Sequence, residues 1–374
     1  MIKLILILII TIITYFLIFT NTRIRTSATF LGAILAIALG LIKFDRAITF
    51  IDFNKLGIII GMMIFIIIAK ESGIFEYLAL KVTIYSKGNP ILLLIYLSLL
   101  TGFLSSILDV LTTLFFLANI TIALTSILEI PALPFLISEI IFANIGGLAT
   151  YIGTPVNITI GSAAKFSFYN FFYHMAPISI ILMSINLLYL IIIFKNTFKP
   201  YNLSRETISH FSKIDIKKVI VNASLYKNSL LILGITILVS FFSPILHLDL
   251  AIIYLLGAIT LLLISHDKPD EIYAQIDWRI IFFLIGLNIL AGTLEENGLV
   301  EIISSKIIIF SGKNLKFLTF IILGFSTFSS AFFDNIPIVT LAIPIIENVF
   351  HQLGFSFTSL IIKQDILDKY KMNK

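Results

Sequence analysis

Long apolar runs alternate with short polar segments along almost the whole chain. A membrane-spanning helix needs about 20 predominantly apolar residues, and runs of this kind recur throughout the sequence. Two further stretches are shorter and more polar, and we expect each to form a helix lying at the membrane interface. The predicted spans are 2–20, 26–43, 56–69, 172–194, 227–243, 248–265 and 279–294, and the predicted interfacial helices are 75–90 and 299–314.

Two other apolar stretches are interrupted midway by polar residues. Residues 91–128 form two apolar arms around Asp109, and residues 316–350 form two arms around Asp334. A charged side chain at the centre of the bilayer costs roughly 2.5–3.5 kcal/mol on insertion scales, so it is rarely kept without a partner. We interpret both stretches as re-entrant hairpins, because irregular backbone at that depth is tolerated only beside protein or a water-filled cavity.

Residues 133–170 are also apolar, but glycine and proline interrupt them. Gly153 and Pro155 would break a helix midway and expose backbone carbonyl and amide groups. Broken helices near the midplane are where transporters commonly bind ions and substrates. Glu129 and Glu139 flank two prolines in this region, and we interpret both as solvated loop or interface charges.

An internal duplication relates the two hairpins. An offset of 225 residues carries Asp109 onto Asp334 without a gap. An odd number of predicted crossings separates the two copies, so we expect the second copy to be an inverted repeat. The second copy stops where the first would reach its broken helix, and we expect it to be incomplete. Other identical pairs at this offset are Asp52/Asp277, Gly61/Gly286, Glu71/Glu296, Gly73/Gly298, Glu76/Glu301, Lys81/Lys306, Asn89/Asn314, Phe103/Phe328 and Ser105/Ser330.

Composition excludes a soluble globular domain. Hydrophobic residues make up 59 % of the chain and charged residues 13 %, against about 25 % charged in soluble domains. We therefore predict an all-α polytopic membrane protein, a multi-pass protein of the cell membrane whose non-protein partner is the lipid bilayer. Its predicted domains are a first repeat at 1–194, a basic connector at 195–226 and an inverted, truncated repeat at 227–374.

Charge and motifs narrow the function further. Lysine and arginine gather in residues 195–227, which places the connector in the cytoplasm by the positive-inside rule. Membrane topology already accounts for basic residues of this kind, so we expect no nucleic-acid partner. The chain has no cysteine, its histidines lack metal-ligand spacing, and HExxH, P-loop and GxSxG motifs are absent. We therefore expect neither an enzyme nor a bound cofactor, apart from a coupling Na⁺ or H⁺.

Candidate site residues follow from the hairpins and the broken helix. A carboxylate with hydroxyl and carbonyl oxygens suits Na⁺, and a desolvated aspartic acid suits proton exchange; the sequence leaves both open for Asp109. Asn144 is expected either to cap a half-helix or to face the ion. The candidates are Asp109, Thr112, Thr113, Asn144, Gly153, Thr154, Asn157, Ser330, Asp334 and Asn335, with a Na⁺ site at Asp109, Thr112 and Asn157.

Three segments carry a family resemblance: KESGIFEYLALKVTIYSKGNP, LSSILDVLTTLFFLANITIAL and SEIIFANIGGLATYIGTPVNITIGSAAKFSFYNFF. They resemble permeases that include arsenite efflux pumps, some sodium/proton antiporters and the pink-eyed-dilution (P) protein. These permeases belong to the ion transporter superfamily, together with carriers that have a citrate transporter-like domain. Two positions depart from the family's motifs, since Val110 stands for an asparagine and Thr154 for an aspartate.

The resemblance implies inverted repeats, hairpins entering from opposite faces, and a site where hairpin tips meet broken helices. It also implies a homodimer with an elevator-like movement. We therefore expect a secondary active ion transporter that works by alternating access. Its cargo is Na⁺ exchanged for H⁺, arsenite or a small carboxylate anion, and the lack of arginine in the site stretches argues against a di- or tricarboxylate. The alternative is a non-transporting, truncated relic or one part of a split transporter.

Overall fold

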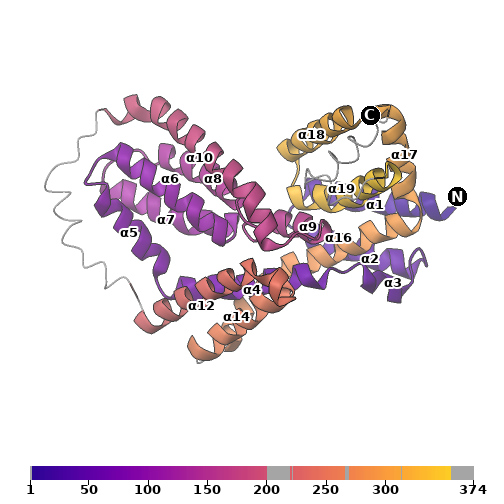
Figure 1. The fold of residues 1–374 in the computed structure, drawn as a ribbon, viewed down its shortest axis with the longest axis horizontal. Helices are drawn as coiled ribbons and strands as arrows, with labels where there is room; N and C mark the ends of the chain where they lie inside the picture. Colours follow the sequence, from indigo (N-terminus) through magenta and orange to yellow (C-terminus); the bar gives the residue numbers. More distant parts are fainter. Residues whose placement is uncertain (1, 200–219, 221, 266–268, 313, 355–374) are drawn as a thin grey trace. The chain divides into compact units, whose positions relative to one another are not determined.

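The computed structural model describes residues 2–199, 220, 222–265, 269–312 and 314–354 (Figure 1). Within these residues the chain forms helices joined by short turns and contains no β-strand. Eight of the described helices are long and apolar enough to cross a membrane, which confirms the predicted all-α polytopic class. They are α1 (Ile2–Thr20), α4 (Phe53–Glu71), α6 (Pro90–Ile107), α7 (Val110–Ile127), α10 (Phe168–Phe198), α12 (Ala223–Phe241), α16 (Trp278–Glu296) and α18 (Leu315–Phe332).

Ten further helices are described, and all are shorter than a span except α19, whose C-terminal part is polar. They are α2 (Arg25–Ala38), α3 (Phe44–Thr49), α5 (Ile74–Tyr85), α8 (Leu133–Gly147), α9 (Pro155–Ala163), α13 (Ser243–Leu246), α14 (Leu250–Ser265), α15 (Pro269–Gln275), α17 (Leu299–Ser311) and α19 (Asn335–Gln352).

The ends of the helices differ from the ends of the predicted spans by up to five residues. The span predicted at 26–43 ends early, at Ala38, because Gly40 adopts a left-handed conformation (φ +65°) that terminates helices. The span predicted at 172–194 is the 31-residue helix α10, which begins after the N-cap Ser167 and continues through Lys195. Helices therefore occupy both ends of the predicted connector 195–226, and most of its basic residues lie outside the described residues.

The duplication recurs in the helix boundaries. Helices α4, α6 and α7 begin and end 225 residues before α16, α18 and α19. Their caps also correspond: the side chain of Asn89 accepts from the first amides of α6, and that of Asn314 does the same for α18. Gly73 and Gly298, which precede α5 and α17, are both left-handed. The same local chemistry thus builds the same series of helices twice, and the inverted insertion of the second series stays a prediction.

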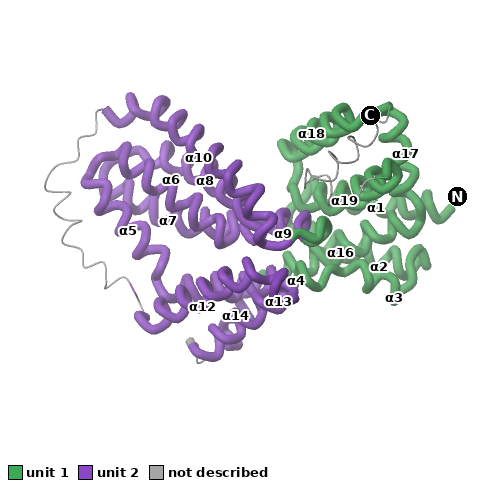
Figure 2. Tube along the Cα trace, in the orientation of Figure 1, with its two compact units in different colours: residues 1–56, 162–166, 277–374 green, residues 57–161, 167–276 purple. Residues whose placement is uncertain are grey.

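The described chain divides into two compact units that cut across the repeats (Figure 2). Unit 1 comprises residues 1–56, 162–166 and 277–374, and unit 2 comprises 57–161 and 167–276. In unit 1, α2 packs closely on α16: a Cβ added to Gly286 would lie 2.8 Å from the carbonyl carbon of Thr29. Small residues allow such close helix contact in membranes.

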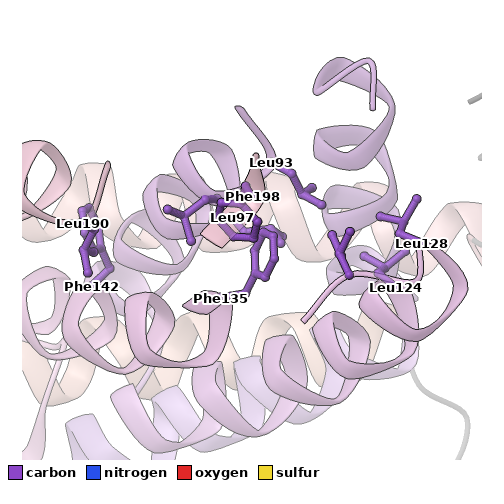
Figure 3. Close-up of a cluster of buried hydrophobic side chains, with 10 residues drawn as sticks. Leu93, Leu97, Leu124, Leu128, Phe135, Phe142, Leu190 and Phe198 are labelled. Carbon is purple, nitrogen blue, oxygen red and sulfur yellow. The ribbon is translucent and has the colours of Figure 1, made fainter. Parts of the chain in front are cut away.

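In unit 2, α8 is the central helix and contacts α6, α7 and α10. A Cβ added to Gly146 would lie only 2.1 Å from the carbonyl oxygen of Gly102, so the backbones of α6 and α8 touch. Large apolar side chains fill the adjoining space, and Phe135 and Phe198 meet with ring centroids 5.3 Å apart (Figure 3). The buried cluster consists of Leu93, Leu94, Leu97, Leu124, Leu128, Ile130, Phe135, Phe142, Leu190 and Phe198.

Candidate functional site

The first hairpin tip lies between α6 and α7. Leu108 and Asp109 are both extended, so the helix breaks at the predicted carboxylate. Asp109 is the N-cap of α7, and its Oδ2 accepts hydrogen bonds from both the amide and the hydroxyl of Thr112, each at 3.0 Å. The Asp109 carboxylate and the Thr112 hydroxyl therefore lie together at the hairpin tip, and their role in ion binding stays a prediction.

Thr113 has a different environment from Thr112. Its side chain is buried, and its Oγ1 has no hydrogen-bond partner among the described residues. Buried polar groups usually have a hydrogen-bond partner. Because the Thr113 hydroxyl has none among the described residues, it is free to bind a ligand or a water molecule. The two predicted threonines thus lie on the same turn, but only Thr112 contacts the carboxylate.

The predicted broken helix is present in unit 2. Helix α8 ends at Gly147 and α9 begins at Pro155. The side-chain amide of Asn157 donates to the carbonyls of Gly147 and Thr150, at 2.8 Å each, and Asn157 is only 4 % exposed. Thr154 caps α9, because its Oγ1 accepts a hydrogen bond from the backbone amide of Asn157 at 3.0 Å. Asn157 and Thr154 therefore hold the two half-helices together.

Unit 2 brings the hairpin tip and the helix break into contact. A Cβ added to Gly147 would lie 2.6 Å from Val110 Cγ2 and 3.0 Å from Thr154 Cγ2. A Cβ added to Gly153 would lie 2.3 Å from the Gly147 carbonyl oxygen. These glycines are therefore needed for close approach, and the hydroxyl of Thr150 adds a hydrogen bond to the Ser106 carbonyl at the end of α6.

The remaining predicted residues are not members of this contact within unit 2. Asn144 is exposed on α8, and its amide donates to the Ile140 carbonyl of its own helix at 2.8 Å, so it does not cap a half-helix. Ser330, Asp334 and Asn335 belong to unit 1, and all three are exposed.

The second hairpin repeats the first but adds a positive partner. Asp334 follows an extended residue and caps α19, with Oδ1 accepting from the Ile336 amide at 3.2 Å. Its Oδ2 also accepts from the Arg25 guanidinium at 2.8 Å, and this guanidinium lies over the ring of Phe283. Among the described residues Asp109 makes no ion pair, so the two equivalent carboxylates differ electrostatically.

We expect the Arg25–Asp334 ion pair to contribute little to stability. Both side chains are about one-third exposed, and pairs of this kind contribute roughly 0.2–1 kcal/mol. A double-mutant cycle with Arg25→Gln and Asp334→Asn, measured by thermal unfolding of the purified protein, would give the coupling free energy. A coupling several times larger would contradict the expectation and show that the pair lies in a medium of low dielectric constant.

Two buried charged residues, Glu139 and Lys55, are not among the site residues predicted from the sequence. Glu139 was predicted to be solvated, and this was wrong: it is fully buried in α8 and accepts a hydrogen bond from the Thr121 hydroxyl of α7. Its neighbouring prolines were misleading, because Pro134 lies in the first turn of α8 and Glu139 follows inside the packed helix. The signal was present, since Glu139, like Asp109, is the one carboxylate in an otherwise apolar stretch.

Lys55 is the second buried charge. It is 2 % exposed, and its Nζ donates to Asn288 Oδ1 of α16 at 3.0 Å. Asp52 caps the start of α4 through the Lys55 amide, at 2.9 Å, and accepts a hydrogen bond from Ser162. These residues lie in unit 1 and form a polar cluster in which the Asn288 amide nitrogen has no partner among the described residues.

The fold and these sites define a multi-pass membrane protein with two aspartate-capped helix hairpins and a broken helix. The family described as citrate transporter matches residues 6–362, and the chain belongs to this citrate transporter family. It is therefore a membrane transporter, and the resemblance seen in the sequence is confirmed.

Relatives are found in bacteria and mammals. The chain is 29 % identical to a 46 kDa membrane protein of Mycobacterium leprae, over 90 % of this chain and 79 % of the relative. It is 30 % identical to an uncharacterized transporter of Mycobacterium tuberculosis, over 80 % of this chain and 69 % of the relative. The P protein of Homo sapiens is 28 % identical over 87 % of this chain, which spans 48 % of that longer protein.

Proposed function

We propose that this membrane transporter is a secondary active ion transporter that works by alternating access. The observation that carries the proposal is the recurrence, 225 residues apart, of two helix hairpins whose tips are capped by Asp109 and Asp334. In unit 2 the first tip also meets a broken helix. Interrupted helices of this kind supply free backbone groups and half-helix ends for binding ions and substrates inside a membrane.

Asp109, Thr112 and Asn157 are the proposed ligands of the coupling ion. Asp109 and Thr112 already share a hydrogen bond, and the Asn157 amide nitrogen is engaged by the Gly147 and Thr150 carbonyls. The Asn157 side-chain oxygen and the Asp109 carboxylate are hard oxygen donors, which suits Na⁺, while a proton would bind at the carboxylate alone.

Citrate, arsenite and H⁺ are the candidate cargoes to be compared. Citrate follows from the family's description, although the site stretches contain no arginine to bind its carboxylates. Arsenite and H⁺ follow from the resemblance of the hairpin and broken-helix segments. The N-terminus of α9 offers an anion few backbone amides, because Pro155 has no N–H and the Asn157 backbone amide is capped by Thr154.

Reconstituted liposomes would test the transport proposal. The purified chain would be sealed into vesicles, internal pH followed while Na⁺ or K⁺ is added outside, and uptake of labelled citrate and arsenite measured with and without an ion gradient. Gradient-dependent movement of any of these solutes, absent from protein-free vesicles, is the expected result. If no gradient drives any of them, the proposal fails.

The inverted repeat gives a topological prediction. Lys81 and Lys306 are equivalent positions on α5 and α17, and the chain has no cysteine, so single cysteines can be introduced without further changes. We expect Lys81→Cys and Lys306→Cys to react with a membrane-impermeant maleimide from opposite sides of intact vesicles. Both would react after the membrane is permeabilised, which is the control for accessibility. Labelling from the same side would contradict an inverted repeat.

A further inference from the structure

Glu139 is a titratable group that the proposed ion site does not use. It lies in the second turn of α8, is 0 % exposed, and its Oε1 accepts a hydrogen bond from the Thr121 hydroxyl of α7. Its other oxygen, Oε2, is buried and has no hydrogen-bond partner among the described residues. This carboxyl group is therefore only half satisfied.

No positive charge compensates Glu139 in the part of the chain that the structure describes. Helices α6 and α7, which pack against α8, contain no acidic, basic or histidine side chain. Helix α10 contributes the apolar side chains of Leu190 and Phe198 to the buried cluster that contains Phe142 of α8. The titratable groups on α6 and α10 are Tyr96, Tyr169, Tyr173, His174, Tyr189 and Lys195, and none of them forms an ion pair or hydrogen bond with Glu139 among the described residues.

An ionised carboxylate in this position would have one hydrogen bond and no counter-charge. Burial without compensation strongly disfavours the charged form, and intramembrane carboxylates commonly serve as proton carriers. We propose that Glu139 is a proton-binding site of the transporter, protonated while α7 and α8 enclose it and deprotonated when water reaches Oε2. This inference rests on the proposed transport activity, with H⁺ as a coupling ion.

Helix α7 links this carboxyl group to the hairpin tip. Asp109 caps the first turn of α7, and Thr121 lies three turns further along the same helix. A displacement of the hairpin therefore moves the Thr121 hydroxyl relative to Glu139. When the two separate and water enters, the O–H bond of the carboxyl breaks, the proton passes to water and the electron pair stays on the carboxylate; reprotonation reverses this step.

Infrared spectroscopy tests the protonation state without any need for transport. The purified protein in lipid would be compared with Glu139→Gln, which keeps the volume of the side chain, and with Glu129→Gln, which changes an exposed carboxylate in the turn before α8. We expect a carboxylic-acid C=O band at neutral pH in the wild type and in Glu129→Gln, and its loss in Glu139→Gln. Thr121→Val should shift this band in frequency, because it removes the hydrogen bond.

Proton counting in liposomes tests the carrier role. We expect Glu139→Gln to move fewer protons per transported solute than the wild type, while solute counterflow without a pH gradient persists. A wild-type spectrum with carboxylate bands alone would overturn the proposal, even if transport is observed. Unchanged proton stoichiometry in Glu139→Gln would overturn it as well. Should no variant transport any solute, the infrared comparison still decides whether Glu139 binds a proton.

Discussion

Asp109→Asn is expected to impair ion-coupled transport severely while leaving the hairpin folded. The asparagine keeps the N-cap of α7, because asparagine and aspartate cap helices equally well. It removes the negative charge that the proposed cation needs. Loss of a side chain that only orients a metal ligand typically lowers metal affinity by roughly 10- to 100-fold. Because Asp109 is itself a proposed ligand, we expect at least this loss in apparent affinity for the coupling ion. Solute uptake as a function of ion concentration in liposomes would measure it.

Two matched variants separate the charge of Asp109 from its structural role. Asp109→Ala removes both the charge and the cap, and should lower the free energy of unfolding by about 1 kcal/mol in addition to the transport defect. Glu129→Gln removes an exposed carboxylate from the turn after α7 and should leave transport unchanged. Wild-type ion dependence in Asp109→Asn would show that the coupling ion binds elsewhere.

Gly146→Ala is expected to cause the largest loss of stability. The added Cβ would lie 2.1 Å from the Gly102 carbonyl oxygen and 2.7 Å from the Gly102 Cα, so helices α6 and α8 would have to separate. Overpacking of a well-packed core typically costs about 1–3 kcal/mol, and a clash with backbone atoms belongs at the upper end. Thermal unfolding in detergent, with the midpoint as the readout, would measure the change.

Gly234→Ala is the matched control for this substitution. Gly234 lies inside α12 and has open space where its Cβ would be. Here alanine should stabilise the helix by up to about 1 kcal/mol, because glycine is the poorer helix former. Equal midpoints for Gly146→Ala and the wild type would show that α6 and α8 are not in backbone contact in the folded protein.

Local chemistry made much of the fold predictable. The hairpin break at Asp109 and the helix break near Gly147 and Pro155 depend on residues close in sequence, so the local pattern of polar residues, glycine and proline predicts them. The duplication is visible as identical residues at a constant offset. Caps such as Asn89 and Asp109 act within three residues of their own position. For the same reason the boundaries of α6 and α7 could be predicted to within a few residues.

Contacts between distant residues could not be predicted in this way. The ion pair of Arg25 with Asp334 joins residues 309 positions apart, and nothing near either residue identifies its partner. The burial of Glu139 depends on how α7 and α8 pack, and the hydrogen bond of Lys55 depends on α16. Isolated charges in apolar stretches are visible in the sequence, but their partners follow only from the tertiary structure.

The interleaving of the two units sets an order of assembly on the ribosome. Unit 2 is complete when residue 276 has been synthesised, whereas unit 1 takes its α16–α19 region from residue 277 onward. Helix α2 packs on α16, so this contact can form only after the whole of unit 2 has been synthesised. Because domains fold during synthesis from the N-terminus onward, we expect unit 2 to fold first although the chain begins in unit 1.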